Sequence, residues 1–171
     1  GLHGVGISVV NALAEFLKIE TVREKKLYEQ TFSRGKVKTK LRCLGSAGKR
    51  KGTTVFFKPD PLIFGDYISF SPANLFQTCE SKAYLMSGLT VKWACPPDLI
   101  TSDSMITSET FYYPKGIIDF LEKKLANHER SDNRLFSGNL QLPRKTQNTS
   151  NTSIEWASSW TTENSGSLQS F

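Results

Sequence analysis

Three glycines, Gly1, Gly4 and Gly6, stand within the first six residues of the chain, and an apolar helical pattern follows them at once. Glycine lets the backbone approach a ligand closely and adopt φ values that a side chain would forbid. A helix that begins just behind such a loop directs its free N–H groups and the positive end of its dipole into the loop, where a phosphate can bind. The spacing is therefore compatible with phosphate binding by backbone amides.

The same glycine spacing also occurs in plain tight turns, so other features must narrow the choice. No Gly-Lys-Ser/Thr follows the glycines, which excludes a Walker loop. No strand precedes them and the next segments are expected to be antiparallel, which argues against a Rossmann fingerprint. From spacing alone, the phosphate site and the plain turn both stay open.

A second feature is a run of positive charge between Arg34 and Lys58, where nine residues are basic and none is acidic. In "KVKTKLRC" basic and uncharged residues alternate, so a strand would place every charge on one face. That cationic face is either a solvated surface or a DNA-binding surface. Its residues are Lys36, Lys38, Lys40 and Arg42.

Hydrophobic periodicity and capping residues predict the elements that position these residues. Helices are expected over 8–17, over 72–87 and over 115–126. The second has Ser71 as N-cap, Pro72 in its first turn and Gly88 as its stop. Its inward stripe is expected to be Phe76, Cys79, Ala83 and Met86. Strands are expected over 18–23, 27–33, 36–43, 53–58, 89–95 and 153–161, the first four as an antiparallel meander.

Composition excludes several classes of protein. The chain has 171 residues, of which 38% are hydrophobic, which is enough for a packed core. No apolar run approaches the roughly 18 residues of a membrane helix, and no secretion signal is present. The three cysteines form no Cys-x-x-Cys, so neither a disulfide framework nor a zinc site is expected. We expect a cytoplasmic protein without a membrane partner. Its net charge of +6 favours a negatively charged binding partner.

The full string "GLHGVGISVVNAL" closely resembles the second glycine box in the B subunits of bacterial type II topoisomerases, which are DNA gyrase and topoisomerase IV. These subunits belong to the GHKL ATPase superfamily. The segments "VREKKLYEQTFSRGK", "KGTTVFFKPDPLIF", "AYLMSGLTV", "FYYPKGIIDFL" and "IEWASSW" resemble the segments that follow in those subunits, in order and at similar spacing. The resemblance spans nearly the whole chain.

This resemblance implies an α+β fold, namely the C-terminal part of the two-layer GHKL (Bergerat-type) sandwich over 1–131 and the beginning of the transducer domain over 132–171. It implies that the chain begins inside the ATP lid, behind the Glu base, the magnesium-binding Asn and the adenine-binding Asp of the family. We therefore expect no catalytic residue and no metal ligand in this chain, and no hydrolysis by the chain alone. For His3 we expect no role as a base.

The resemblance also assigns roles to single residues. Thr53, in "GTTV", would help to recognise adenine, Ile7 and Val55 would line the adenine slot, and Arg23 would lie at the rim where aminocoumarin inhibitors bind. Backbone N–H groups would hold the ATP phosphates at Leu2, His3, Gly4, Val5 and Gly6. The cofactors implied are ATP and Mg²⁺.

For the intact subunit, the resemblance implies an ATP-dependent topoisomerase that acts on DNA. Its partners would be the topoisomerase A subunit and a second B subunit, with which it dimerises on binding ATP. Topoisomerase IV is slightly favoured over gyrase by "RLFSGNL" and "IEWASSW". Two alternatives are another GHKL-type ATPase and a basic nucleic-acid-binding module that uses no ATP.

Overall fold

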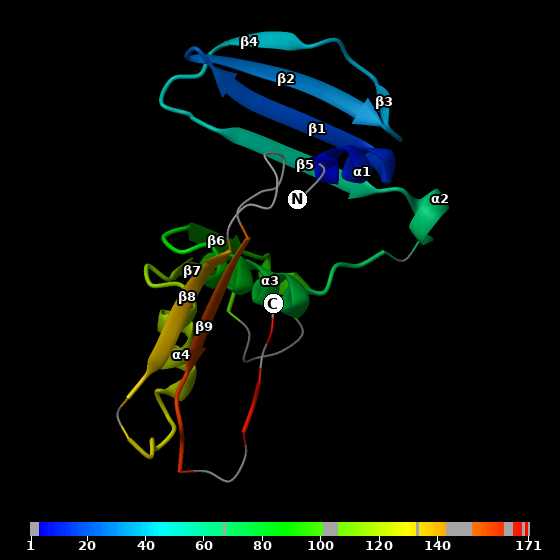
Figure 1. The fold of residues 1–171 in the computed structure, drawn as a ribbon. Coiled ribbons are helices and arrows are strands. Elements are labelled where there is room, and N and C mark those ends of the chain that lie inside the picture. The colour runs from blue at the N-terminus through cyan, green and yellow to red at the C-terminus, as the bar shows by residue number, and fades with distance from the viewer. Residues whose placement is uncertain are drawn as a thin grey trace. The chain divides into compact units, whose positions relative to one another are not determined.

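A computed structural model of the chain describes residues 4–66, 68–100, 106–132, 134–142, 152–162, 166–168 and 170. The chain divides into two compact units, Gly1–Ser69 and Phe70–Phe171, which we call the N-terminal and the C-terminal unit (Figure 1). Both combine helices with antiparallel strands, so the fold is α+β, as predicted.

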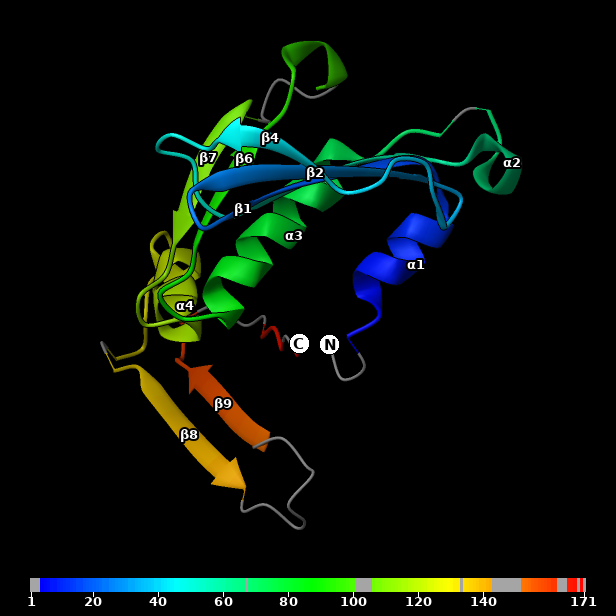
Figure 2. The same cartoon turned by 90° about the horizontal axis from the view of Figure 1, so that it is seen from above.

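The N-terminal unit is a short helix followed by a five-stranded antiparallel sheet. The strand order is β3-β2-β1-β5, and β4 pairs with β2 as well. Figure 2 shows α1 on one side of this sheet. The elements are α1 Gly6–Ala12, β1 Ala14–Arg23, β2 Lys26–Ser33, β3 Lys36–Val37, β4 Arg42–Ser46, β5 Thr53–Pro59 and α2 Pro61–Phe64.

The predicted first helix is too long by one turn. It was expected over 8–17, but α1 ends at Ala12 and β1 begins at Ala14. Leu17 is fully buried in β1, between Phe32 of β2 and Phe57 of β5. An apolar residue every three or four positions fits a helix. Here the segment is a strand instead, because β2 and β5 on either side of it supply hydrogen-bond partners for its backbone.

An ion pair between the exposed Arg34 and the buried Asp60 holds the junction of α1 and β1. The Asp60 side chain is only 2% exposed, and its Oδ1 accepts a hydrogen bond from Arg34 Nη2 at 3.0 Å. The Asp60 N–H donates to Leu13 O at 3.0 Å, while the Arg34 N–H donates to Ala14 O at 2.8 Å. Asp60 also caps α2 by accepting from the Leu62 N–H. Two segments distant in sequence are thus bonded to each other and to the end of α1.

In its described residues, the C-terminal unit contains the helices α3 and α4, a short 3₁₀ helix and two antiparallel strand pairs, β6-β7 and β8-β9. Helix α3 begins as predicted, because Ser71 caps it through a hydrogen bond from the Asn74 N–H and Pro72 is its first residue. The elements are α3 Pro72–Leu85, β6 Thr90–Ala94, the 3₁₀ helix η1 Pro97–Leu99, β7 Ser108–Tyr112, α4 Ile117–Leu125, β8 Phe136–Leu142 and β9 Thr152–Ser158.

The core of this unit is aromatic. Phe76 of α3 contacts Trp93 and Phe111 edge to face, with ring centroids 5.9 and 5.0 Å apart. Tyr84 stacks on Phe120 of α4 at 3.9 Å. The buried residues are Ala83, Tyr84, Trp93, Phe111 and Tyr113.

Three of the four residues predicted to face inward from α3 do so, namely Phe76, Cys79 and Ala83. The fourth, Met86, is 56% exposed, so its prediction was wrong. The helix ends at Leu85, and Met86 has the non-helical angles φ −120° and ψ 78°. Its side chain therefore leaves the helical stripe that the spacing implies.

A polar cluster joins α3, α4 and the residue after β7. Glu80 accepts hydrogen bonds from Tyr113 Oη at 2.7 Å and from Lys123 Nζ at 2.8 Å. Burial raises the pKa of Glu80, but the hydrogen bonds from Lys123 and Tyr113 outweigh burial, so the net pKa lies below the ordinary 4.5. The same contacts raise the pKa of Lys123 against the effect of burial.

We expect E80Q to lower the melting temperature near neutral pH by about 2–5 °C, because the charge-assisted bond with Lys123 is lost. A carboxyl with a lowered pKa stabilises the fold above its ordinary pKa, and this stabilisation is lost as the pH falls through the lowered pKa. The gap between wild type and E80Q should therefore shrink below pH 4.5. Thermal denaturation followed by tryptophan fluorescence measures it. E122Q, at an exposed residue of α4, is the control. A gap independent of pH would contradict the prediction.

Candidate nucleotide site

The predicted phosphate loop leads into α1 in an open conformation. Gly4 has φ +63°, a value that favours glycine, and Val5 is the N-cap of α1. A Cβ built on Gly4 or Gly6 would meet no atom within 4 Å, so space for a ligand lies beside both. Ile7 is exposed in the first turn. Leu2 and His3 lie outside the described residues.

The predicted adenine residues lie on β5. Thr53 pairs with Thr21 of β1, and Val55 pairs with Ile19. Directly opposite residues of antiparallel strands project from the same face, so these four side chains share one face of the sheet. The Oγ1 atoms of Thr21 and Thr53 are 3.0 Å apart and form a hydrogen bond. Val55 is 42% exposed, which leaves this part of the face open.

The helix that follows the predicted phosphate loop and the strand that carries the predicted adenine residues both contact β1. Helix α1 packs against β1 and β2, and β5 is hydrogen-bonded to β1 along its length. Thr21 lies four residues further along β1 than the buried Leu17, which at about 3.3 Å per residue is about 13 Å. Thr53 thus lies toward the end of β1 that is remote from α1.

Arg23 is the last residue of β1 and is exposed. It pairs with Lys26 across the β1–β2 turn, beyond the Thr21–Thr53 pair. This position is compatible with a rim residue. His128 is exposed in the turn after α4, outside the N-terminal unit.

The predicted strand over 36–43 was wrong, and with it the single cationic face. Strand β3 covers only Lys36–Val37, and β4 begins at Arg42. Between them, Thr31 O of β2 accepts from the N–H groups of both Lys38 and Thr39, at 2.9 and 3.3 Å. Thr39 Oγ1 also pairs with Thr31 Oγ1 at 3.1 Å, so side chains compete with the ladder and the strand breaks.

The four basic residues consequently differ in their surroundings. Arg42 Nη2 donates to Glu29 Oε1 at 2.6 Å, which neutralises part of the expected charge. Lys36, Lys38 and Lys40 are exposed, but they do not alternate along one strand.

Sequence reasoning missed two features of this unit. The Thr21–Thr53 pair depends on strand register, for which the sequence carried no signal. The Arg34–Asp60 pair was partly visible, because Asp60 followed by Pro61 is a helix-start signal. Its partner, 26 residues earlier, was not.

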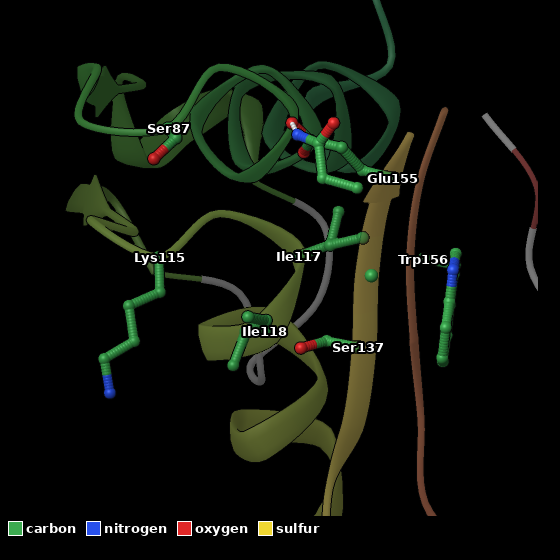
Figure 3. A pocket seen from close by; sticks show the side chains of 9 residues that line it. Ser87, Lys115, Ile117, Ile118, Ser137, Glu155 and Trp156 are labelled. Atoms are coloured by element: carbon green, nitrogen blue, oxygen red, sulfur yellow. Dashed lines mark hydrogen bonds between the residues drawn. The ribbon is translucent and has the colours of Figure 1, made fainter. Parts of the chain in front are cut away.

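A hollow of ≈ 260 Å³ lies in the C-terminal unit between the start of α4 and the β8–β9 hairpin (Figure 3). Ile117, Ser137 and Trp156 are among its lining residues, and Ser137 points toward α4 in Figure 3. None of the predicted site residues lines it. Within the described ranges, no three His, Cys, Asp or Glu side chains gather into a metal site, and no helix is long and apolar enough to cross a membrane.

Comparison with known proteins gives relatives over nearly the whole chain, although no protein-family model matches. The chain is 42% identical to the B subunit of DNA topoisomerase 4 from Bartonella bacilliformis over 161 residues, which are 94% of this chain and 22% of that protein. It is 37% identical to the same protein of Rickettsia bellii over an alignment of 172 positions, which covers all of this chain and 25% of that protein. It is 42% identical to the B subunit of DNA gyrase from Thermus thermophilus over 130 residues, or 75% of this chain and 19% of that protein.

A solved structure agrees with these sequences. The 43K ATPase domain of Thermus thermophilus gyrase B, crystallised with an aminocoumarin, matches 83% of this chain and 36% of its own length, with a TM-score of 0.66 and 32% identity. The match confirms the predicted GHKL fold. The chain spans about a quarter of the length of the curated relatives. Over nearly its whole length, this chain is therefore a homologue of the B subunits of bacterial type II topoisomerases, and it resembles part of their ATPase region.

Proposed function

We propose that this chain forms part of the ATP site of a bacterial type II topoisomerase B subunit, whose intact form couples ATP hydrolysis to the passage of one DNA segment through another. One observation supports it above all: the helix α1 that follows the glycine loop packs against β1, and the Gly-Thr strand β5, which directly follows Gly52, 46 residues after Gly6, is hydrogen-bonded to the same β1. An apolar sheet face with a few polar groups is typical of nucleotide sites.

The phosphate half of the proposed site uses backbone rather than side chains. The amides of Leu2, His3, Gly4, Val5 and Gly6 would hold the triphosphate. The left-handed φ of Gly4 and the open space beside Gly4 and Gly6 support close approach of a ligand.

The adenine half uses the exposed sheet face. Thr53 would bind the base through its hydroxyl, which can donate and accept. Ile7 and Val55 would supply apolar walls, and Arg23 would lie at the rim. An aminocoumarin bound to the related gyrase B ATPase domain supports a rim site of this kind.

No three His, Cys, Asp or Glu side chains gather among the described residues, and we assign no Mg²⁺ ligand to them. We propose that the metal ligands, the general base and the adenine-binding Asp come from other parts of the intact subunit. The chain alone would then not hydrolyse ATP.

Gly4→Val should weaken binding of a non-hydrolysable ATP analogue to the full-length subunit at least about tenfold, because valine is strained at positive φ and fills the space beside the loop. Isothermal titration measures the affinity. Gly48→Val is a matched control, since Gly48 has φ +57° and equally open surroundings in the same unit. Equal losses in both variants, or no binding by wild type, would overturn the proposed site.

We further propose that the basic segment contacts DNA in the intact subunit. Replacing Lys36, Lys38, Lys40 and Arg42 with Gln should flatten the salt dependence of DNA binding, by about 0.9 in the log–log slope for each phosphate that the variant no longer neutralises. Fluorescence anisotropy at several salt concentrations measures the slope. The control variant replaces Lys82, Lys92, Lys115 and Lys124 of the C-terminal unit with Gln, so that it loses the same number of charges. An unchanged slope in the first variant would refute the proposal that this segment contacts DNA.

Other expectations for the intact subunit are proposals of the same kind. They are an A-subunit partner, dimerisation on ATP binding, a cytoplasmic location and a boundary between ATPase and transducer domains near residues 131 and 132. Relatives include both topoisomerase IV and gyrase subunits, and we favour topoisomerase IV. Decatenation without supercoiling by the reconstituted enzyme would support this choice, and supercoiling would refute it.

A further inference from the structure

The hydrogen bond between Thr21 and Thr53 is the feature of the proposed site that the resemblance does not assign. The two hydroxyl oxygens lie 3.0 Å apart at directly opposite positions of β1 and β5. A hydroxyl carries one proton and two lone pairs, so only one of the two protons is used between them. The pair keeps a second proton and free lone pairs that can face a ligand.

The surroundings of the pair suit a flat, uncharged group. Ile19 and Val55 are the next residues on the same face, and Tyr28 of β2 lies opposite Thr21. Alternation along β1 and β2 places Glu20 and Glu29 on the other face. The ion pairs of Glu20 with Lys18 and Arg50, and of Glu29 with Arg42, therefore lie on the opposite face, and the charge next to the threonines on their own face is that of Arg23, two residues further along β1.

Burial differs between the two threonines. Thr21 is half-buried, whereas Thr53 is exposed on the edge strand β5. Thr21 can therefore hold the Thr53 hydroxyl in place and still leave that hydroxyl accessible to a ligand. A single exposed hydroxyl rotates freely, while one held by a neighbour presents its proton or its lone pair in a fixed direction.

We infer that Thr21 is a positioning residue for base recognition, which orients the Thr53 hydroxyl toward the adenine edge of a bound nucleotide. This inference rests on the proposed ATP site. Adenine offers both nitrogen acceptors and an exocyclic amino donor, so an oriented hydroxyl that donates or accepts on demand complements it. The phosphates, which the glycine loop would hold, are independent of this pair.

The test uses isothermal titration of the full-length subunit with two probes: a non-hydrolysable ATP analogue and inorganic tripolyphosphate, which has no base. Thr21→Val keeps the shape and the strand preference of the side chain and removes only the hydroxyl. Thr21→Val should weaken binding of the ATP analogue about two- to tenfold, as expected for one hydrogen bond. Tripolyphosphate binding should not change. Thr21→Ser should retain wild-type binding.

Thr53→Val and the double variant separate this inference from the function on which it rests. Thr53→Val should weaken the ATP analogue, and adding Thr21→Val should then weaken it no further, since Thr21 acts through Thr53. If Thr53→Val has an effect and Thr21→Val has none, the inference fails and the proposed ATP site stands. If Thr53→Val leaves the ATP analogue unaffected, the proposed adenine site itself fails. Equal losses for both probes in Thr21→Val would show a merely structural role and overturn the inference.

Discussion

Replacing Phe111 with alanine should lower the free energy of unfolding of the C-terminal unit by about 3–5 kcal/mol. Phe111 is 3% exposed on β7, and its ring meets that of Phe76 of α3. Its removal would leave a cavity between hairpin and helix, which the surrounding rings of Trp93 and Tyr84 cannot fill without leaving their own contacts. This should be among the most destabilising single changes in the unit.

Urea unfolding followed by tryptophan fluorescence measures this effect, because all three tryptophans, Trp93, Trp156 and Trp160, belong to the C-terminal unit. Tyr112→Ala is the matched control, since Tyr112 is the next residue of β7 and faces solvent. It should lose less than about 1 kcal/mol. Similar losses at both positions would mean that the hairpin does not pack on α3 through Phe111.

Replacing Asp60 with alanine should destabilise the N-terminal unit, with a fall in melting temperature of about 5–10 °C. The change removes the carboxylate that binds Arg34 and caps α2, and it leaves the Arg34 guanidinium without its buried partner. Hydrogen exchange measured by mass spectrometry follows this unit separately, with lost protection expected first in β1 and β5. Asp66→Ala removes an exposed carboxylate of the same unit and should have little effect.

The Asp60 effect should depend on pH. The hydrogen bond from Arg34 lowers the pKa of Asp60 below the ordinary 3.8, although burial opposes it. A carboxyl of this kind stabilises the fold above its ordinary pKa, and the stabilisation is lost as the pH falls through the lowered value. Wild type and Asp60→Ala should therefore differ fully near neutral pH and converge below pH 3.8. A constant difference would attribute the loss to packing alone.

Local signals in the sequence predicted those elements whose ends carry a chemical marker. Ser71 and Pro72 fixed the start of α3, because a hydroxyl N-cap and a proline in the first turn both favour that position. The strands of 27–33 and 53–58 were predicted within one residue, as runs of β-branched and aromatic residues between turns. A prediction could still fail at the far end of such an element. Met86 was predicted to face inward, but the helix ends at Leu85, one residue before it.

Elements with a choice of backbone partners could not be predicted locally. Residues 14–17 fit a helix by period, but they belong to β1 because β2 and β5 flank them. Residues 36–43 fit one strand by alternation, but the Thr31–Thr39 contacts break it. In both segments a residue outside the segment decided the outcome: Phe57 of β5 lies 40 residues after Leu17, and Thr31 lies eight residues before Thr39.

By itself, the sequence determined the glycine loop, the Gly-Thr strand, the run of positive charge and the resemblance that joins them, because these depend on residue type and order alone. Only the tertiary structure decided that Thr21 lies against Thr53, that Arg34 meets Asp60 and that the basic residues do not share one strand face. The physical reason is that each of these depends on strand register and chain reversal, where a shift of one residue turns every side chain to the other face.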